Sequence, residues 1–182
     1  LLRELYTCDG AGTLICRDVY DGIRKATDKD VLGIMEMIQP LMDAGILTHR
    51  THADMLEELE HAYVFVRDET PMACGMLVPH GLDHAEISCL AVQQKYRGRG
   101  RGDLMLTYLE RIAVQAGITN IFVLSTQSMQ WFMERGFEEV GIDSLPRQRR
   151  ERYNWQRRSK VYLKELRSVQ EVVAEELFLN AD

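Results

Sequence analysis

The feature that most constrains this chain is the segment QQKYRGRGRGD at residues 93–103, in which three glycines alternate with arginines. It lies between an apolar run, EISCLAV, and a run with helical periodicity, DLMLTYLERIAVQAG. Three structures are compatible with it: a disordered nucleic-acid-binding tail, a loop that cradles phosphate, or a tight turn between a strand and a helix. The flanks favour the last two, because Arg-Gly tails need long repetition in a polar context.

The spacing of the glycines narrows the choice. A nucleoside triphosphate loop needs G-x-x-x-x-G-K-[ST], and the dinucleotide fingerprint needs G-x-G-x-x-G, for which Gly102 falls one place early. What remains is a turn whose backbone N–H groups converge at a helix N-terminus, where hydrogen bonds and the helix dipole bind phosphate. Arg97, Arg99 and Arg101 would add positive charge. From these residues alone, a turn without a ligand stays open as the alternative.

The charge balance argues against a nucleic-acid-binding surface. The chain has 22 Lys and Arg against 28 Asp and Glu, a net charge of −6. None of its four cysteines forms a C-x-x-C pair, which favours a reducing compartment. No apolar stretch approaches the roughly 20 residues needed to span a bilayer. His49 and His52 lack a third ligand nearby, so we expect no metal site. Because the first residue is Leu, we expect the chain to be part of a longer protein.

The order of the expected elements predicts an α/β fold with a mixed central sheet flanked by helices. Thr27 and Thr51 each precede an aspartate by three residues, the spacing of a capping box, and so predict two helix starts. Pro40 is expected to end the first helix. Strands are expected at 13–18, 22–27, 63–67, 71–78, 84–92, 120–125, 137–141 and 159–166. Further helices are expected at 103–116 and 128–135 and after Pro146.

The segment at 97–102 resembles the R/Q-x-x-G-x-G/A signature of the GCN5-related N-acetyltransferases, and CLAV precedes it as in their fourth strand. WFMERGF resembles a later stretch of that family, and the resemblance spans about residues 20–165. It implies an acetyl-CoA site: a glycine loop that holds the pyrophosphate, and a splayed strand whose amides serve the pantetheine arm and the thioester oxygen. The residues that the resemblance assigns to acetyl-CoA are Leu90, Ala91, Val92, Arg97, Gly98, Arg99, Gly100, Arg101, Gly102, Asp103 and Phe132. Phe132 is a departure, because many members have a Tyr general acid there.

A narrower resemblance is to the acetyltransferase domains of bacterial- and plant-type N-acetylglutamate synthases, carried by GIRKAT, IQPLMDAGILTHRT, FVLSTQSMQWFMERGF and YNWQRRSKV. It implies acetyl transfer from acetyl-CoA to the α-amine of L-glutamate, the first step of arginine biosynthesis. Residues 1–18 are similar to the end of the amino-acid-kinase-like domain that precedes it there. We therefore expect the acetyltransferase domain at 19–167 and an acidic amphipathic extension at 168–182. The family also implies a homo-oligomer in the full-length protein, in the cytoplasm of a bacterium or the chloroplast of a plant or alga.

Catalysis of acetyl transfer to an amine needs a base, because an amino-acid ammonium is mostly protonated near neutral pH. Glu86 matches the family's proposed base, and on so apolar a strand we expect its pKa to be raised. Strand alternation predicts that Glu86, Ser88 and Leu90 share one face and Ile87, Cys89 and Ala91 the other. An exposed carboxylate at the sheet edge is the alternative for Glu86. Ser159 is a candidate acid, although an alkyl thiol needs little help to leave.

Glutamate carries two carboxylates, so its pocket should offer two cations, and arginine suits bidentate carboxylate binding. The family resemblance points to Arg50 and Arg157 with Ser159, and to backbone contacts from Cys89. The remaining arginines of the basic run are expected to form a solvated face or to meet the 3′-phosphate of CoA: Arg147, Arg149, Arg150 and Arg152. Two other functions stay open, namely the same fold acting on another amine, or a regulatory module that binds acyl-CoA without turnover.

Overall fold

The computed structural model describes residues 21–68 and 70–166, which form one seven-stranded mixed sheet in the order β1-β2-β3-β4-β5-β7-β6. All neighbouring strands are antiparallel except β4 and β5, which are parallel. The strands are β1 (Asp21–Lys25), β2 (Ala62–Arg67), β3 (Thr70–His80), β4 (His84–Val92), β5 (Asn120–Ser125), β6 (Glu138–Val140) and β7 (Lys160–Glu165). The expected α/β class with a mixed sheet is confirmed.

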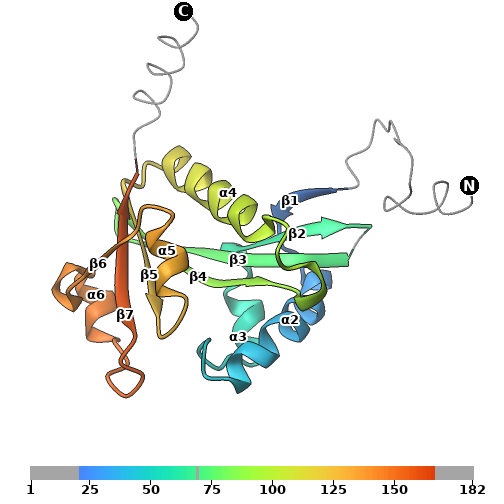
Figure 1. Ribbon diagram of the computed structural model, residues 1–182, viewed down its shortest axis with the longest axis horizontal. Helices are drawn as coiled ribbons and strands as arrows, with labels where there is room; N and C mark the ends of the chain where they lie inside the picture. Colours follow the sequence, from blue (N-terminus) through green and yellow to red (C-terminus); the bar gives the residue numbers. More distant parts are fainter. Residues whose placement is uncertain (1–20, 69, 167–182) are drawn as a thin grey trace, which may run out of the picture.

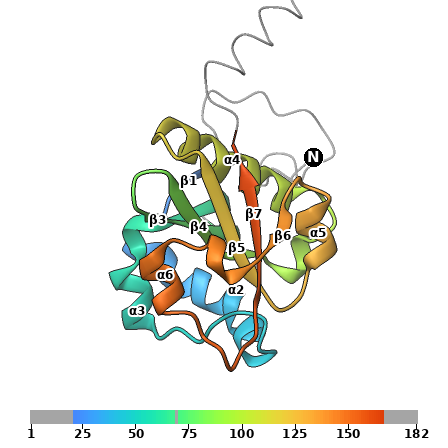
Figure 2. The ribbon, with the colours of Figure 1, turned by 90° about the vertical axis from the view of Figure 1, so that its left-hand side faces the viewer.

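Helices cover both faces of this sheet (Figure 1). The α-helices are α2 (Val31–Asp43), α3 (His52–Glu57), α4 (Arg101–Gln115), α5 (Met129–Met133) and α6 (Arg147–Glu151). Short 3₁₀ turns lie at η1 (Asp28–Asp30), η2 (Leu59–His61), η3 (Gln94–Tyr96) and η4 (Ile142–Ser144). Helix α4 lies above β3 and β4, and α2 and α3 lie below them (Figure 1). Helices α5 and α6 lie on opposite sides of β5 and β7 (Figure 2). Within the described residues, no helix is long and apolar enough to cross a bilayer.

Each face of the sheet has its own apolar core. The core under α4 is built around Met105, Leu109 and Phe132, and the core over α2 around Ile34, Ile38 and Met76. A smaller cluster joins Phe122 of β5 to Tyr153, beyond α6. Along β4, buried and partly buried residues alternate, and none is exposed.

Most of the elements expected between residues 21 and 166 are present, but Pro40 does not end its helix. Helix α2 continues to Asp43, and Pro40 lies inside it. A proline cannot donate the backbone hydrogen bond to the carbonyl four residues earlier and its ring crowds that carbonyl, but here this weakens the helix without ending it. The chain instead leaves the helix at Gly45, whose φ of 70° is left-handed. The strand expected at 13–18 and the segments assigned to 1–18 and 168–182 lie outside the described residues.

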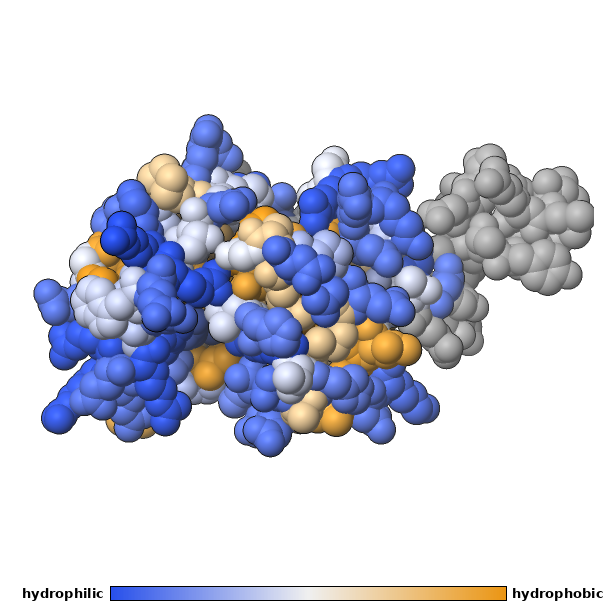
Figure 3. Space-filling model, turned by 90° about the horizontal axis from the view of Figure 1, so that it is seen from below, coloured by the Kyte–Doolittle hydropathy of each residue, from blue (hydrophilic) through white to orange (hydrophobic). Residues whose placement is uncertain are grey.

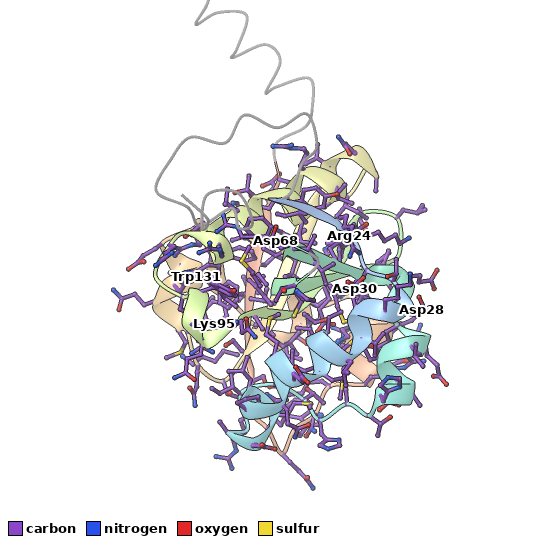
Figure 4. The ribbon with its side chains drawn as sticks, turned by 90° about the vertical axis from the view of Figure 1, so that its right-hand side faces the viewer. Arg24, Asp28, Asp30, Asp68, Lys95 and Trp131 are labelled. Atoms are coloured by element: carbon purple, nitrogen blue, oxygen red, sulfur yellow. The ribbon has the colours of Figure 1, made fainter. Side chains whose placement is uncertain are left out.

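The predicted capping box at Thr27 organises the start of α2 around the buried carboxylate of Asp30. Both the amide and the hydroxyl of Thr27 donate to Asp30 Oδ2 at 2.8 Å. Arg24 of β1 donates from Nη1 and Nη2 at 2.7 and 2.9 Å, and Figure 4 shows the two side chains together. Burial alone would raise the pKa of Asp30, but these hydrogen bonds and the charge of Arg24 lower it to about 2. The carboxylate thus ties the edge strand to the helix.

We expect Asp30→Asn to destabilise the domain by about 2 kcal/mol at neutral pH, from the difference between the folded pKa and the ordinary value of about 3.9. Because the folded pKa is the lower one, this stability is present above about pH 4 and is lost as the pH falls toward 2. Urea denaturation of both proteins at pH 7 and near pH 3 checks it. The difference between wild type and variant should shrink at the lower pH, and a difference independent of pH would contradict it.

Candidate active site

The two halves of the sheet separate between β4 and β5. These strands pair only at His84, Ala85 and Glu86, opposite Asn120, Ile121 and Phe122. Within the described residues no backbone pairing joins them beyond Glu86, and Figure 1 shows the strands diverging. The second half of β4 therefore has a backbone edge that β5 does not cover. This confirms the splayed strand that the family resemblance implied.

A β-bulge at Cys89 makes the predicted face assignment of β4 wrong. Cys89 has a φ of 49°, and the register with β3 shifts there, so that Cys89 and Leu90 lie opposite Gly75. A bulge adds one residue to a strand and reverses the alternation beyond it. Leu90 thus packs with Ile87 against the core under α4, whereas Cys89 and Ala91 pack into the core over α2. Cys89 therefore lies on the same face of β4 as Glu86, whereas strict alternation predicted opposite faces for the two residues.

The glycine loop forms the predicted turn at the N-terminus of α4. Gly98 and Gly100 both have φ of 73°, in the left-handed region that favours glycine, and Gly100 is the N-cap of the helix. A Cβ added to either glycine would meet no described atom within 4 Å. The loop thus presents bare backbone to open space at the positive end of a helix dipole, which is the geometry of an anion site.

The three loop arginines have different positions. Arg97 is exposed and donates from Nε to the Val92 carbonyl at 3.1 Å, on the wall of the cleft. Arg101 is buried, with its guanidinium 5.2 Å from the ring centre of Tyr96. Arg99 is exposed and does not line the cleft. Within the described residues, therefore, only two of the three expected cations lie at this site.

A cavity of about 570 Å³ occupies the space between the diverging strands. Its wall comprises Leu41, Ile46, Leu47, Ile87, Ser88, Cys89, Leu90, Ala91, Val92, Tyr96, Arg97, Gly98, Gly100, Arg101, Gly102, Asp103, Val123, Leu124, Ser125, Ser128, Trp131 and Phe132. The glycine loop forms one end, and apolar side chains line most of the rest. From below, the molecule is hollowed between the part that carries α6 and β7 and the part that carries α2 and α3 (Figure 3). This shape suits a long ligand with an anionic end and an apolar stem.

An aromatic pair from α5 closes the side of the cavity next to the loop. The rings of Trp131 and Phe132 lie 5.0 Å apart in a T-shaped arrangement. The guanidinium of Arg135 lies 3.9 Å from the Trp131 ring centre and pairs with Asp103 in the first turn of α4. In Figure 4, Trp131 lies on the side of the molecule opposite Arg24. Phe132 is buried in the core and forms part of the cavity wall. Its phenyl ring has no hydroxyl group and so cannot donate a proton.

Glu86 lies at the point where β4 leaves β5, directly before the first residue of β4 that lines the cavity. Its side chain is only 13% exposed, so it is not an exposed edge carboxylate. Arg149 of α6 donates to both of its oxygens, and His80 Nε2 of β3 lies 3.4 Å from Oε2. Burial would raise its pKa, as expected, but the contacts with His80 and Arg149 outweigh burial and lower it. The expected rise is wrong because the carboxylate is buried together with a cation.

Arg50 lies on the same side of the sheet. Its guanidinium is 17% exposed and donates from Nε to Glu58 at 2.9 Å. Burial raises the pKa of the neighbouring Cys89 thiol to about 11, and the charge of Arg50 only partly offsets this. Cys89 is therefore a neutral thiol at physiological pH and a poor nucleophile. This part of the site can bind a carboxylate and is not suited to a covalent acyl-cysteine.

Arg157 links the loop before β7 to the segment that follows α2. It lies in the loop before β7 and donates to Thr48 Oγ1 at 2.5 Å and to the carbonyl of Ile46 at 2.8 Å. The segment it contacts follows α2 and contributes Ile46 and Leu47 to the cavity wall. Arg157 thus lies beside the segment that leads to Arg50, although neither arginine is among the described residues that line the cavity.

Ser159 is not brought to the cavity. It is buried and lines a separate hollow between β6 and β7, together with Trp155 and Arg158. Its carbonyl accepts a hydrogen bond from the Tyr153 hydroxyl. Ser159 directly precedes β7 and is buried, so its two-residue spacing from Arg157 does not carry it into the cleft.

Two features of the site were not predicted from the residues. Arg149 was expected in a solvated face or at the 3′-phosphate of CoA, but it pairs with Glu86, whereas Arg147 is exposed. Ser125, at the end of β5, lines the cavity where the strands part. The sequence could have indicated Ser125, because this residue ends an apolar strand. No feature of the sequence distinguishes Arg149 from the three other arginines of the same basic run. In the described part of the chain, no three His, Cys, Asp or Glu side chains are grouped to hold a metal ion.

Comparisons with known proteins agree with this geometry. Residues 34–137 match the acetyltransferase (GNAT) family. The amino-acid acetyltransferase of Enterobacter sp. (strain 638) is 43% identical over 170 residues, which are 91% of this chain and 38% of that protein. The amino-acid acetyltransferase of Escherichia coli K12 is 41% identical over 167 residues, with the same coverage. The chain thus spans 38% of the length of these relatives.

Solved structures of an acetyltransferase are also similar to this chain. N-acetylglutamate synthase from Neisseria gonorrhoeae, complexed with coenzyme A and N-acetyl-glutamate, matches with a TM-score of 0.78 and 33% identity. That match covers 91% of this chain and 40% of the other. The same enzyme complexed with coenzyme A and L-arginine matches with a TM-score of 0.79 and 33% identity, over 91% of this chain and 38% of the other. With its splayed strands, its glycine loop and a family match over more than half of its length, the chain belongs to the acetyltransferase (GNAT) family.

Proposed function

We propose that this domain transfers the acetyl group of acetyl-CoA to the α-amine of L-glutamate, giving N-acetyl-L-glutamate and CoA. The observation that carries the proposal is the cleft itself, which has a glycine loop at one end. Glu86, Arg50 and Arg157 do not line it, but each is next to a residue of its wall: Ile87, Cys89 and Ile46, respectively. The names of the relatives support an amino acid as acceptor, and the ligands of the Neisseria gonorrhoeae enzyme support CoA and glutamate.

Acetyl-CoA fits the cleft in its charge pattern. The pyrophosphate would bind the amides of Gly98 and Gly100, with the N-terminus of α4 and Arg97 adding positive charge. The pantetheine arm would lie along the uncovered edge of β4 at Leu90–Val92, against Trp131 and Phe132. An amide of that edge would bind the thioester oxygen as it becomes negative, and one such donor contributes about 10²–10³-fold in rate.

The acetyl group would pass directly from CoA to the amine, without an acyl-enzyme intermediate. Glu86 takes a proton from the ammonium of glutamate, directly or through water, and leaves a neutral amine. The amine nitrogen forms a bond to the thioester carbon, the C–S bond breaks, and the second amine proton passes to the departing sulfur. An alkyl thiolate leaves readily because its pKa is near 8.5, so Phe132 in place of Tyr is tolerated. The neutral, buried Cys89 supports direct transfer.

The acceptor pocket gives the sharpest test. If Arg50 and Arg157 bind the two carboxylates, glutamine should lose one charge-assisted bond, about 1.5–3 kcal/mol, and be roughly 10- to 150-fold poorer in kcat/KM. Aspartate is one methylene short and should be poor for geometric reasons. Arg50→Ala should raise the KM for glutamate by a similar factor and leave that for acetyl-CoA nearly unchanged. The measurement is the initial rate of CoA thiol release with each amino acid.

Two outcomes would contradict the proposal. Equal turnover of glutamate and glutamine would point to another acceptor amine. Tight acetyl-CoA binding without thiol release from any amino acid would indicate a regulatory module that binds acyl-CoA. Arg24→Ala is a suitable control, because Arg24 also pairs with a carboxylate but lies on the edge strand β1, separated from β4 by β2 and β3. Its kinetic constants should equal those of the wild type.

A further inference from the structure

Helix α6 carries a group of similar arginines, of which Arg149 is turned inward. The Arg149 side chain is 20% exposed, whereas Arg147 on the same helix is 85% exposed and pairs with Glu151 one turn away. Arg150 is 41% exposed and pairs with Asp143. A surface arginine contributes little by pairing, but a buried one must have a partner. The inward position of Arg149 therefore points to a specific role.

The partner of Arg149 is the carboxylate of Glu86, 63 residues away in the chain. Nε donates to Oε2 at 2.5 Å and Nη2 to Oε1 at 3.1 Å, a two-pronged pair that fixes the plane of the carboxylate. The other groups that face Glu86 are His80 of β3, Arg50 from the segment before α3, and the Cys89 thiol of β4. Among these described groups, only Arg149 donates hydrogen bonds to both carboxylate oxygens of Glu86.

We propose that Arg149 is a positioning residue for Glu86: it holds the carboxylate in one plane and in the ionised form until the acceptor ammonium arrives. The inference rests on the proposed function, in which Glu86 is the base. Two N–H donors use two of the four lone-pair sites of a carboxylate, so sites for the incoming proton remain. Proton uptake weakens the pair with Arg149, and loss of the proton to solvent restores it. The lowered pKa of Glu86 agrees with this arrangement.

Two substitutions separate the charge of Arg149 from its shape. Arg149→Gln removes the charge, so the pKa of Glu86 should rise. The acid limb of the pH profile of kcat/KM should then move to higher pH. Arg149→Lys keeps a charge but not the fork. Its acid limb should stay close to that of the wild type, while its plateau kcat falls about 10- to 100-fold because the carboxylate is no longer held in position.

Arg147→Gln is the matched control, because it removes the same charge from the same helix at an exposed position. Its pH profile and kcat should equal those of the wild type. The KM for acetyl-CoA should be unchanged in all three variants, since α6 does not line the cavity within the described residues. Lys restoring full kcat would show that charge alone suffices and would overturn the positioning role.

A direct titration of Glu86 by carboxyl NMR, assigned with Glu86→Gln, separates this inference from the proposed function. The wild-type pKa should be lower than that of Arg149→Gln whether or not the domain acetylates glutamate. If glutamate is not turned over, the proposed function fails but this titration still decides whether Arg149 holds Glu86 ionised. No upward shift in Arg149→Gln would overturn the inference. A shift in the titration without a shift in the acid limb would show a purely structural pair and would overturn it as well.

Discussion

Glu86→Gln should lower kcat by about 10²–10⁴-fold, the contribution typical of a general base, with little change in the KM for acetyl-CoA. Gln keeps the shape of the side chain and can still accept one hydrogen bond from Arg149, so the fold of α6 against β4 should persist. It cannot take a proton from the ammonium of the acceptor. Steady-state rates of thiol release at saturating acetyl-CoA measure the loss.

The pH dependence tests the assignment more strictly. The pKa of Glu86 is lowered, so the wild-type carboxylate is ionised throughout the neutral range and its acid limb should lie below the ordinary value of about 4.3. The deficit of Glu86→Gln should shrink at high pH, where the acceptor amine loses its proton unaided. A deficit that is the same at every pH would contradict the base role and indicate a positioning role.

Glu110→Gln is a matched control for this experiment. Glu110 on α4 is also a partly buried carboxylate with a cationic partner, Lys164, whose Nζ lies 2.7 Å from its Oε1. It does not line the cavity. Loss of stability without loss of kcat is expected there, which separates the cost of breaking a buried pair from the loss of a base.

Gly100→Val should weaken acetyl-CoA binding by at least about 10²-fold. The Cβ would project into the space that no described atom of the protein fills, and that we assign to the pyrophosphate. Loss of two charge-assisted backbone hydrogen bonds costs about 3–6 kcal/mol, which corresponds to roughly 10²–10⁴-fold in affinity. The left-handed φ of 73° adds about 1–2 kcal/mol of strain to the fold. Calorimetric titration with CoA measures the affinity, and thermal unfolding measures the strain.

Gly117→Val separates strain from loss of binding. Gly117 follows the other end of α4, has a φ of 80°, and likewise has no described neighbour within 4 Å of an added Cβ. The two variants should lose comparable stability, but only Gly100→Val should lose affinity for CoA. Unchanged CoA affinity in a folded Gly100→Val protein would overturn the assignment of the loop to phosphate.

Much of the fold and one end of the site are predictable from the sequence because their determinants are local. A left-handed turn needs glycine, so Gly98 and Gly100 mark the turn wherever the chain places it. The capping boxes at Thr27 and Thr51 depend on spacings of three residues. Apolar composition alone identifies β4 and β5 as buried strands. Such signals act within a few residues, and the tertiary structure leaves them unchanged.

The catalytic end depends on contacts between residues far apart in the chain. The bulge at Cys89 reverses the faces of β4, and strict alternation cannot anticipate it because the register is set by pairing with β3. Arg149 meets Glu86 across 63 residues and Arg157 meets Thr48 across 109. Burial alone would raise the pKa of Glu86, and only the tertiary contacts with His80 of β3 and Arg149 of α6 lower it. The sequence by itself thus determined the glycine turn before α4 and the strands that frame the cleft. The tertiary structure decided which charges face one another there, since electrostatic interactions depend on distances in space and not on positions along the chain.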